Sequence, residues 1–286
     1  MAHPRLRAAT LARVRAHLAD AARIAGWSVR QQFPRSAGDT EELAAALNPS
    51  DLLVAAGGDG FIGRAAAGTI RSGATLAPIP TGRGNDFARA VGVAPDPFEA
   101  IARLPALTPR RIDVGMAGSR VFISVACMGV DSVANHLANS NRWLRSSLVY
   151  PLSGALAILR HHPADYQLEC ELPDGTTQIR QVRGWTVAVG CTDRYGGGLM
   201  VCPGARPDDG LLNVVTIGAV RRWQFLSVLR AMSTGRHVQL AAVTSQQVRS
   251  IRVTATDPLR VYADGDQVGW LPISLAVQPR ALRLLA

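Results

Sequence analysis

Residues 51–60 read Asp-Leu-Leu-Val-Ala-Ala-Gly-Gly-Asp-Gly, and this stretch decides the fold of the first half of the chain. A short apolar run that passes directly into glycines is typical of a buried strand followed by a tight turn. The run at residues 75–79 ends in the same way, in Pro80-Thr-Gly-Arg-Gly-Asn-Asp86. Helical spacing follows each turn, and the second of these helices is predicted to begin near Phe87. The alternation predicts a parallel sheet with covering helices up to about residue 105.

The segment before these turns is predicted to hold two helices and a strand. Apolar residues at helical spacing indicate a helix at residues 5–25, and residues 27–31 are predicted as a short strand. A second helix is predicted at residues 40–47, with Asp39 or Thr40 as its N-cap.

From Arg111 onward the pattern changes to strand-like runs separated by turns, which predicts a domain built mainly of antiparallel strands. Two helices are predicted within it, at about residues 145–160 and 222–232. The predicted strands lie at residues 121–126, 166–172, 185–190, 211–217, 248–255 and 259–262.

The charge of the chain narrows the class of its partners. A net charge of +10 favours anionic partners, such as nucleotide phosphates and acidic lipid headgroups. None of the 31 basic residues is lysine, which excludes a P-loop of the GK[ST] type and the lysine of protein kinases. The sequence has no basic stripe with interleaved aromatic residues, so no nucleic-acid partner is predicted.

The hydropathy pattern predicts a cytoplasmic protein with peripheral contact to a membrane surface. The longest apolar stretch, residues 147–159, is interrupted by Pro151 and Gly154 and falls short of the roughly 20 residues of a membrane span. The N-terminal segment lacks the continuous apolar run of a secretory signal. Residues 147–159 are compatible with a guide for an acyl chain, a segment lying against a bilayer or an ordinary core helix.

The two glycine-rich turns are the first candidate site. In open α/β sheets, ligands bind at the carboxyl ends of parallel strands, where backbone N–H groups at a helix start attract anions. Asp59 and Asp86 each lie inside one of these turns, as expected of carboxylates that order a phosphate-binding loop or meet a metal ion. The alternative interpretation is a pair of ordinary strand-to-helix turns.

Three more glycine clusters follow in the second half of the chain. They are Tyr195-Gly-Gly-Gly-Leu-Met200, Asp208-Asp-Gly-Leu-Leu212 and Asp264-Gly-Asp266. Taken singly, each reads as a hairpin turn, because Asp-Gly is a strong turn signal.

Taken together and in this order, the motifs resemble the diacylglycerol-kinase catalytic-domain family, which is related to sphingosine kinases and more remotely to NAD kinases. The resemblance covers about residues 40–286. Its most specific part is Asn85-Asp-Phe-Ala-Arg89, which argues against an NAD kinase.

The resemblance implies an α/β nucleotide-binding domain at residues 1–108, joined by a returning C-terminal strand at 277–286, and a β-sandwich-like domain at 109–276. It implies ATP and Mg²⁺ as cofactors, an alcohol of lipid type as the acceptor, and leaves a homodimer open. The implied nucleotide-binding residues are Gly57, Gly58, Asp59, Gly60, Phe61, Arg64, Thr81, Gly82, Arg83, Gly84, Asn85 and Asp86.

The same resemblance implies the remaining site residues. Asp209, with the main-chain carbonyls of Arg206 and Leu211, corresponds to a magnesium site of oxygen ligands. Asp266 stands where the family has its general base, and Asp59 and Asp264 are expected to be catalytic with it.

The chain departs from the family pattern at several of these positions. Asp266 replaces a glutamate and is shorter by one methylene, and Phe61 and Arg83 replace threonines. Gly63-Arg64 replaces an Asn-Glu pair, and Arg64 and Arg83 are expected to contact phosphate through their guanidinium groups. The opening strand of the family and its Asn-Pro-x-Ser-Gly loop are predicted to be missing from the chain, which begins Met1-Ala-His-Pro4.

The sequence is compatible with three functions. The first is an active kinase in which Asp266 accepts the proton of the alcohol, which is either a lipid such as diacylglycerol or a diverged non-lipid acceptor. The second is a catalytically inactive relative that binds a lipid, a nucleotide or a protein. The third is an enzyme like NAD kinase, which rests only on the Gly-Gly-Asp-Gly turn.

Overall fold

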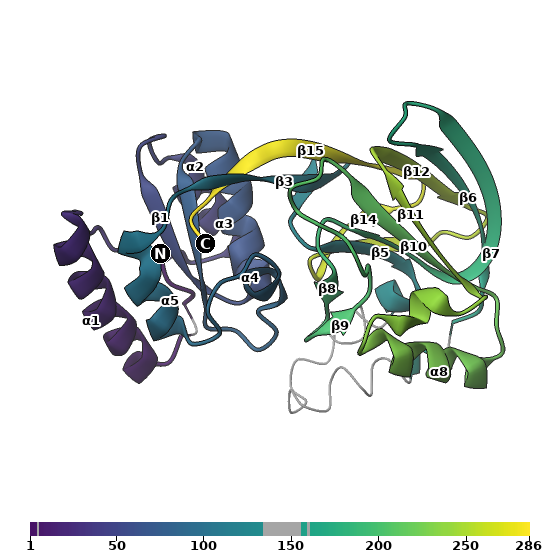
Figure 1. Ribbon diagram of the computed structural model, residues 1–286, viewed down its shortest axis with the longest axis horizontal. Coiled ribbons are helices and arrows are strands. Elements are labelled where there is room, and N and C mark those ends of the chain that lie inside the picture. The colour runs from purple at the N-terminus through teal and green to yellow at the C-terminus, as the bar shows by residue number, and fades with distance from the viewer. Residues whose placement is uncertain (5, 134–155, 159–160) are drawn as a thin grey trace. The chain divides into compact units, whose positions relative to one another are not determined.

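The computed structural model describes residues 1–4, 6–133, 156–158 and 161–286 (Figure 1). The chain forms two compact units, Met1–Asp113 with Pro279–Ala286, and Val114–Gln278. It passes from one to the other within strands β3 (Arg110–Ala117) and β15 (Ile273–Leu284).

The first unit is an α/β domain around a short parallel sheet. Strand β1 (Leu52–Gly57) pairs in parallel with β2 (Thr75–Pro80), and Leu284 of β15 pairs in parallel with Leu76 of β2. The helices are α1 (Ala8–Ala25), α2 (Ala37–Ala45), α3 (Asp59–Ser72), α4 (Asp86–Ala90), α5 (Pro97–Arg103) and the 3-10 turn η1 (Leu104–Ala106). Helices α1 and α5 cover one face of the sheet and α2 and α3 the other (Figure 1). The predicted parallel sheet with covering helices is confirmed.

Two local predictions in this unit are wrong. Residues 27–31 form no strand, because their apolar side chains Trp27 and Val29 are exposed rather than packed on the sheet. Helix α2 begins at Ala37, not at residue 40, because the hydroxyl of Ser36 caps it by accepting the N–H of Asp39 (3.1 Å).

The segment before α1 forms a single parallel bridge to β1 in place of an opening strand. Ala2 forms a parallel bridge with Ala56 of β1, the N–H of Ala56 donates to the carbonyl of Met1 (3.0 Å), and the N–H of His3 donates to the carbonyl of Ala56 (2.9 Å). This single bridge does not make a strand, and Pro4 lies in a turn after it.

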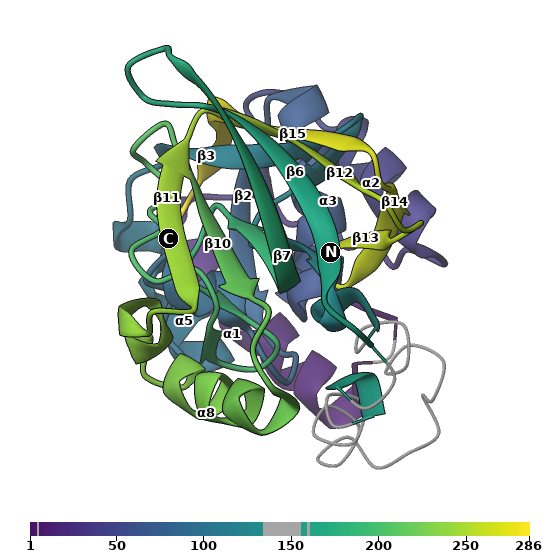
Figure 2. The same ribbon diagram turned by 90° about the vertical axis from the view of Figure 1, so that its right-hand side faces the viewer.

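The second unit is an antiparallel β-sandwich, as predicted. Figure 2 shows β11, β10, β7, β6, β12 and β15 side by side, and the ladder continues from β7 through β5 and β13 to β14. The long strand β7 joins the layers, because its first half pairs with β6 and its second half with β10 and β5. The strands are β4 (Arg120–Phe122), β5 (Val125–Gly129), β6 (Ala164–Glu171), β7 (Thr177–Gly190), β8 (Arg194–Tyr195), β9 (Leu199–Met200), β10 (Leu212–Gly218), β11 (Val243–Val248), β12 (Ser250–Ala255), β13 (Arg260–Ala263) and β14 (Asp266–Trp270).

Helix α8 (Arg222–Met232) covers one face of the sandwich, and its bounds agree with those predicted from the sequence. The 3-10 turn η2 (Arg236–Gln239) follows it. Phe225 of α8 packs on Trp185 of β7, with ring centroids 5.0 Å apart. The predicted helix at 145–160 lies mostly outside the described residues, although residues 156–158 are helical. In the described part of the chain, no helix combines the length and the apolar character that crossing a bilayer requires.

Two predicted strands are interrupted. The run at 248–255 is divided at Arg249 between β11 and β12. The run at 121–126 is divided between β4 and β5, because the N–H groups of Ile123 and Ser124 donate to the carboxylate of Asp264.

Candidate active site

The two glycine-rich turns of the first unit are in direct contact. They follow β1 and β2 at the same edge of the sheet, and the N–H of Thr81 donates to the carbonyl of Gly57 (3.1 Å). A Cβ atom on Gly82 would lie 2.4 Å from the Cα of Gly58, and one on Gly58 would lie 3.3 Å from the Cα of Gly82. Position 82 therefore needs glycine, because the atom that its Cβ would meet is backbone, whereas the contact at position 58 is only tight.

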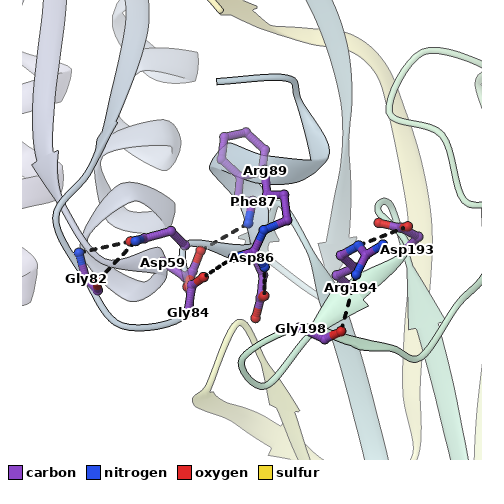
Figure 3. A network of polar contacts seen from close by, with 10 residues as sticks. Asp59, Gly82, Gly84, Asp86, Phe87, Arg89, Asp193, Arg194 and Gly198 are labelled. Carbon is purple, nitrogen blue, oxygen red and sulfur yellow. Dashed lines mark hydrogen bonds and ion pairs between the residues drawn. The ribbon is translucent and has the colours of Figure 1, made fainter. Parts of the chain in front are cut away.

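The second turn is held in shape by its own asparagine. Asn85 adopts a left-handed conformation (φ 52°), which asparagine tolerates better than most residues. Its side-chain oxygen accepts the N–H of Gly82 (2.9 Å), and its side-chain nitrogen donates to the carbonyl of Gly82 (3.1 Å) (Figure 3). Arg83 is exposed in this turn, while the hydroxyl of Thr81 is buried and has no hydrogen-bond partner among the described residues.

Two carboxylates stand at helix starts beside these turns. Asp59 is the first residue of α3 and accepts the N–H of Phe87 in α4 (3.1 Å). Asp86 is the first residue of α4, is only 4% exposed, and forms an ion pair with Arg89 (3.3 Å) (Figure 3). A helix N-terminus stabilises a negative charge, which explains why these carboxylates are tolerated so close together.

The pKa of Asp59 is raised above its usual value. Burial is the main cause and the nearby charge of Asp86 adds to it, whereas the backbone N–H groups of Phe87 and Asn85 oppose the shift. A carboxylate that is buried beside a second carboxylate costs stability, and such arrangements are concentrated at functional sites.

We expect Asp59→Asn to be more stable than the wild type at neutral pH. Because the raised pKa makes the folded chain bind more protons than the unfolded chain, ionisation of Asp59 lowers the free energy of unfolding as the pH rises above the usual aspartate range. Asparagine can still accept the N–H of Phe87 but carries no charge. Urea unfolding at neutral and at acidic pH measures the difference, which should shrink on acidification.

The matched control for this test is Asp20→Asn, which changes an exposed aspartate of α1 that is paired with Arg23. Its effect should be small at both pH values, because surface ion pairs contribute little. An Asp59→Asn protein less stable than the wild type at neutral pH would contradict the account of Asp59 as a destabilising charge.

Three other residues predicted for this site have different surroundings. Phe61 is buried against Gly57 and lies edge-on to the ring of His3, with ring centroids 5.4 Å apart. The guanidinium of Arg64 forms an ion pair with Glu41 of α2 (3.6 Å). Gly60 is exposed at the start of α3. The packing of His3 on Phe61 was missed, because nothing in the sequence connects these positions.

In the second unit, Asp264 anchors the turn that carries Asp266. Asp264 and Gly265 have positive φ angles (50° and 86°) between β13 and β14, as a tight hairpin turn requires. The carboxylate of Asp264 accepts the N–H groups of Ile123 (2.7 Å) and Ser124 (2.9 Å). Asp266 is exposed as the first residue of β14. Asp264 therefore fixes the position of the turn.

Replacing Asp264 with asparagine is expected to lower the free energy of unfolding by about 2 kcal/mol, because hydrogen bonds to a charged group are worth about 1.5–3 kcal/mol each and the amide replaces one acceptor with a donor. The matched control is Asp174→Asn, which changes another Asp-Gly turn. The carboxylate of Asp174 accepts hydrogen bonds from the N–H and the hydroxyl of Thr176, two residues along the same turn. Urea unfolding should show little change for the control. If both variants lose the same free energy of unfolding, the hydrogen bonds from Ile123 and Ser124 to Asp264 do not contribute to stability.

The predicted magnesium loop lies between β9 and β10. One oxygen of Asp209 accepts the N–H of Leu211 (3.0 Å), and the other accepts the side-chain nitrogen of Gln247 (3.2 Å). In the described ranges, no group of three His, Cys, Asp or Glu side chains could hold a metal. The predicted site has one carboxylate and two carbonyls, a set of hard oxygen ligands that fits Mg²⁺.

The triple-glycine cluster forms the hairpin between β8 and β9. Gly196, Gly197 and Gly198 all have positive φ angles (70°, 87° and 107°), which other residues rarely adopt. Arg194 donates to the carbonyl of Gly198 (3.4 Å) and pairs with Asp193 (3.5 Å) (Figure 3). The interpretation of this cluster as a hairpin turn is confirmed.

Comparison with known proteins gives a consistent result for both units. Residues 7–117 match the diacylglycerol kinase catalytic domain, and residues 124–286 match the YegS C-terminal NAD kinase beta sandwich-like domain. The chain is 31% identical over 249 residues to a diacylglycerol kinase of Mycobacterium tuberculosis, covering 85% of this chain and 79% of that protein. It is 32% identical over 239 residues to a probable YegS-like lipid kinase of Pseudomonas aeruginosa, covering 81% of this chain and 75% of that protein.

The fold is also found in solved structures. A putative diacylglycerol kinase from Bacillus anthracis superposes with a TM-score of 0.80 at 20% identity, covering 99% of this chain and 94% of that one. At this identity the likeness concerns the fold alone.

Proposed function

The chain belongs to the diacylglycerol kinase family, and from this premise we propose that it transfers the γ-phosphoryl group of ATP to the hydroxyl of a lipid alcohol, with diacylglycerol as the first acceptor to test. The observation that carries the proposal is the contact between the Gly57–Gly60 and Thr81–Asp86 turns, which places Asp59 and Asp86 together at the carboxyl edge of the sheet.

The first unit is proposed to hold the nucleotide. The turns offer backbone N–H groups at the starts of α3 and α4, which suit phosphate oxygens. Arg83, exposed in the second turn, is proposed to add a guanidinium contact. Arg64 is left out, since it pairs with Glu41.

In the second unit, Asp266 is proposed as the general base. Its carboxylate accepts the proton of the acceptor hydroxyl while the hydroxyl oxygen bonds to the γ-phosphorus of ATP and ADP leaves. Phosphoryl transfer depends chiefly on positioning and on neutralising charge, so a short carboxylate on a well-fixed turn is suited to this role. Asp264 is proposed as the residue that fixes the turn, through Ile123 and Ser124.

Mg²⁺ is proposed as the metal ion of the enzyme. Asp209 with the carbonyls of Arg206 and Leu211 would hold it, and when bound it would supply positive charge that offsets the acidic groups of the site. We also propose that the protein is cytoplasmic and contacts a membrane peripherally, where its lipid acceptor resides. A homodimer is a further proposal, which a measurement of the oligomeric state tests.

Calorimetric titration with ATP, with and without Mg²⁺, tests the nucleotide half of this proposal. Saturable binding that strengthens with Mg²⁺ supports it, and incubation with ATP and a panel of lipid and non-lipid alcohols then identifies the acceptor by the phosphorylated product. A protein that binds no nucleotide under any of these conditions would contradict it.

A further inference from the structure

Helix α8 carries apolar side chains on its outer face as well as its inner one. Phe225, Val228 and Met232 are buried against the sandwich. On the outer face, Trp223 is 61% exposed and Leu226 is 52% exposed. They are three residues apart, and Arg230 follows four residues later, so these three side chains lie on one face of the helix. A helix that packs on a core needs only one apolar face, so the second is available for another partner.

The charged residues of the sequence segment that contains this helix are all of one sign. No aspartate or glutamate occurs between Gly210 and Thr256. The arginines in the same stretch are Arg221, Arg222, Arg230, Arg236, Arg249 and Arg252. Arg221 and Arg230, which flank the Trp223–Leu226 pair, are exposed. A single exposed apolar residue needs no explanation, but a tryptophan and a leucine on one face within an acid-free, arginine-rich stretch form a patch with a defined chemistry.

The helix is held firmly enough to present this patch. Arg222 donates to the carbonyl of Ile158 (3.1 Å) and lies 3.2 Å from the Nε2 of His162, while the Nε1–H of Trp185 donates to the carbonyl of Val220 (2.9 Å). Figure 2 shows α8 along one border of the second unit, with the strands beside it. A rigid helix binds a surface without first having to be ordered.

We propose that the outer face of α8, formed by Trp223, Leu226 and Arg230, with Arg221 at the N-cap of the helix, docks on an anionic lipid bilayer. Tryptophan lies favourably at the boundary between headgroups and acyl chains, and arginines beside it pair with lipid phosphates. The arginines without any carboxylate favour a polyanionic surface over a second copy of this chain, whose same face would repel it. This surface adds a membrane-binding site to the proposed kinase and does not depend on catalysis.

Co-sedimentation of the whole chain with phosphatidylcholine vesicles that contain increasing phosphatidylglycerol tests the proposal. Binding should rise with the anionic fraction and weaken with salt, because exposed charges are screened. Arg230→Ala is expected to weaken binding about five-fold, the effect of one arginine near an anionic surface. Trp223→Ser with Leu226→Ser is expected to weaken it about ten-fold or more, through loss of buried apolar area.

The matched control is Trp27→Ser with Ile179→Ser, which removes an exposed tryptophan and an exposed aliphatic residue elsewhere (38% and 63% exposed). It should bind like the wild type. If the control and the α8 double variant lose equal affinity, or if binding is the same on pure phosphatidylcholine, the proposal is overturned.

A second readout keeps the test independent of the folding of the serine variant. Brominated lipids should quench part of the tryptophan fluorescence of the wild type, and Trp223→Phe should lose that part while still binding vesicles. Quenching unchanged in Trp223→Phe would overturn the proposal, as would sedimentation velocity showing that the double variant only converts a dimer to a monomer.

Kinase activity separates this proposal from the previous one. On a short-chain acceptor dispersed in detergent, the double variant should phosphorylate at the wild-type rate. A protein that binds vesicles through Trp223 but transfers no phosphate would contradict the kinase and leave the α8 surface standing.

Discussion

Replacing Asp266 with asparagine is expected to lower the kcat for phosphate transfer by about 10² to 10⁴, the range typical of general-base assistance. The amide has the shape of the carboxylate but cannot accept the proton of the acceptor hydroxyl. Because Asp266 is exposed at the start of β14, the substitution should leave the fold intact. Initial rates at saturating ATP and acceptor measure the effect, and calorimetry should show unchanged nucleotide binding.

Two further variants make this test specific. Asp266→Glu keeps a carboxylate, so its kcat should far exceed that of the asparagine variant even if the longer side chain misplaces it. Asp165→Asn removes an exposed carboxylate of the same unit, paired with Arg183, and should retain wild-type kcat. If Asp266→Asn and Asp165→Asn turn over equally fast, Asp266 is not the base.

Replacing Gly82 with alanine is expected to separate the two glycine-rich turns and to weaken ATP binding by about ten-fold or more, since a misplacement of about 1 Å in a binding site can cost 10². The added Cβ would lie 2.4 Å from the Cα of Gly58 and 2.9 Å from the side-chain oxygen of Asn85. Backbone cannot rotate away as a side chain does, so we also expect the free energy of unfolding to fall by about 1–3 kcal/mol.

Calorimetry with ATP and urea unfolding measure these two effects. The matched control is Gly38→Ala in α2, where the nearest atom to the added Cβ is the Ser36 hydroxyl oxygen at 3.9 Å. In this helix alanine should raise the free energy of unfolding by about 0.4–1 kcal/mol and leave ATP binding unchanged. A Gly82→Ala protein that binds ATP as the wild type does would show that the contact between the turns is not needed.

The sequence predicted those helices and strands that are marked by a local pattern of apolar residues and turns. The strands before Gly57 and Thr81 were visible because a short apolar run meets a glycine turn, and α8 was visible because its apolar residues recur at helical spacing. The bridge at Ala2 involves a single residue and so carries no pattern. The cap at Ser36 was missed because neighbouring residues offered equally good caps.

The site was predicted as a set of residues but not as an arrangement. No local sequence pattern indicates that Gly58 and Gly82 are in contact. Nor does one indicate that Asp264 accepts the N–H groups of Ile123 and Ser124, which are 141 and 140 positions away in the sequence. These are tertiary contacts between segments that are distant in sequence. The ion pair of Arg64 with Glu41 was not visible in the sequence for the same reason, because it joins two different helices, α3 and α2.

The packing around Phe61 gives a reason for a phenylalanine at a position where the family pattern has threonine. A threonine at this position would offer a hydroxyl to the nucleotide, whereas Phe61 fills the space over Gly57 and lies against the ring of His3. In this chain the apolar ring takes part in the core beside the turn, so nucleotide contacts are expected from the backbone N–H groups and from Arg83.

Transfer of labelled phosphate from ATP to diacylglycerol in mixed micelles tests the central claim most directly. The wild type is predicted to form labelled phosphatidic acid at a rate that depends on Mg²⁺, and Asp266→Asn to form almost none. No labelled product from diacylglycerol or from any alcohol of the panel, with a folded protein that binds ATP, would contradict the proposed activity.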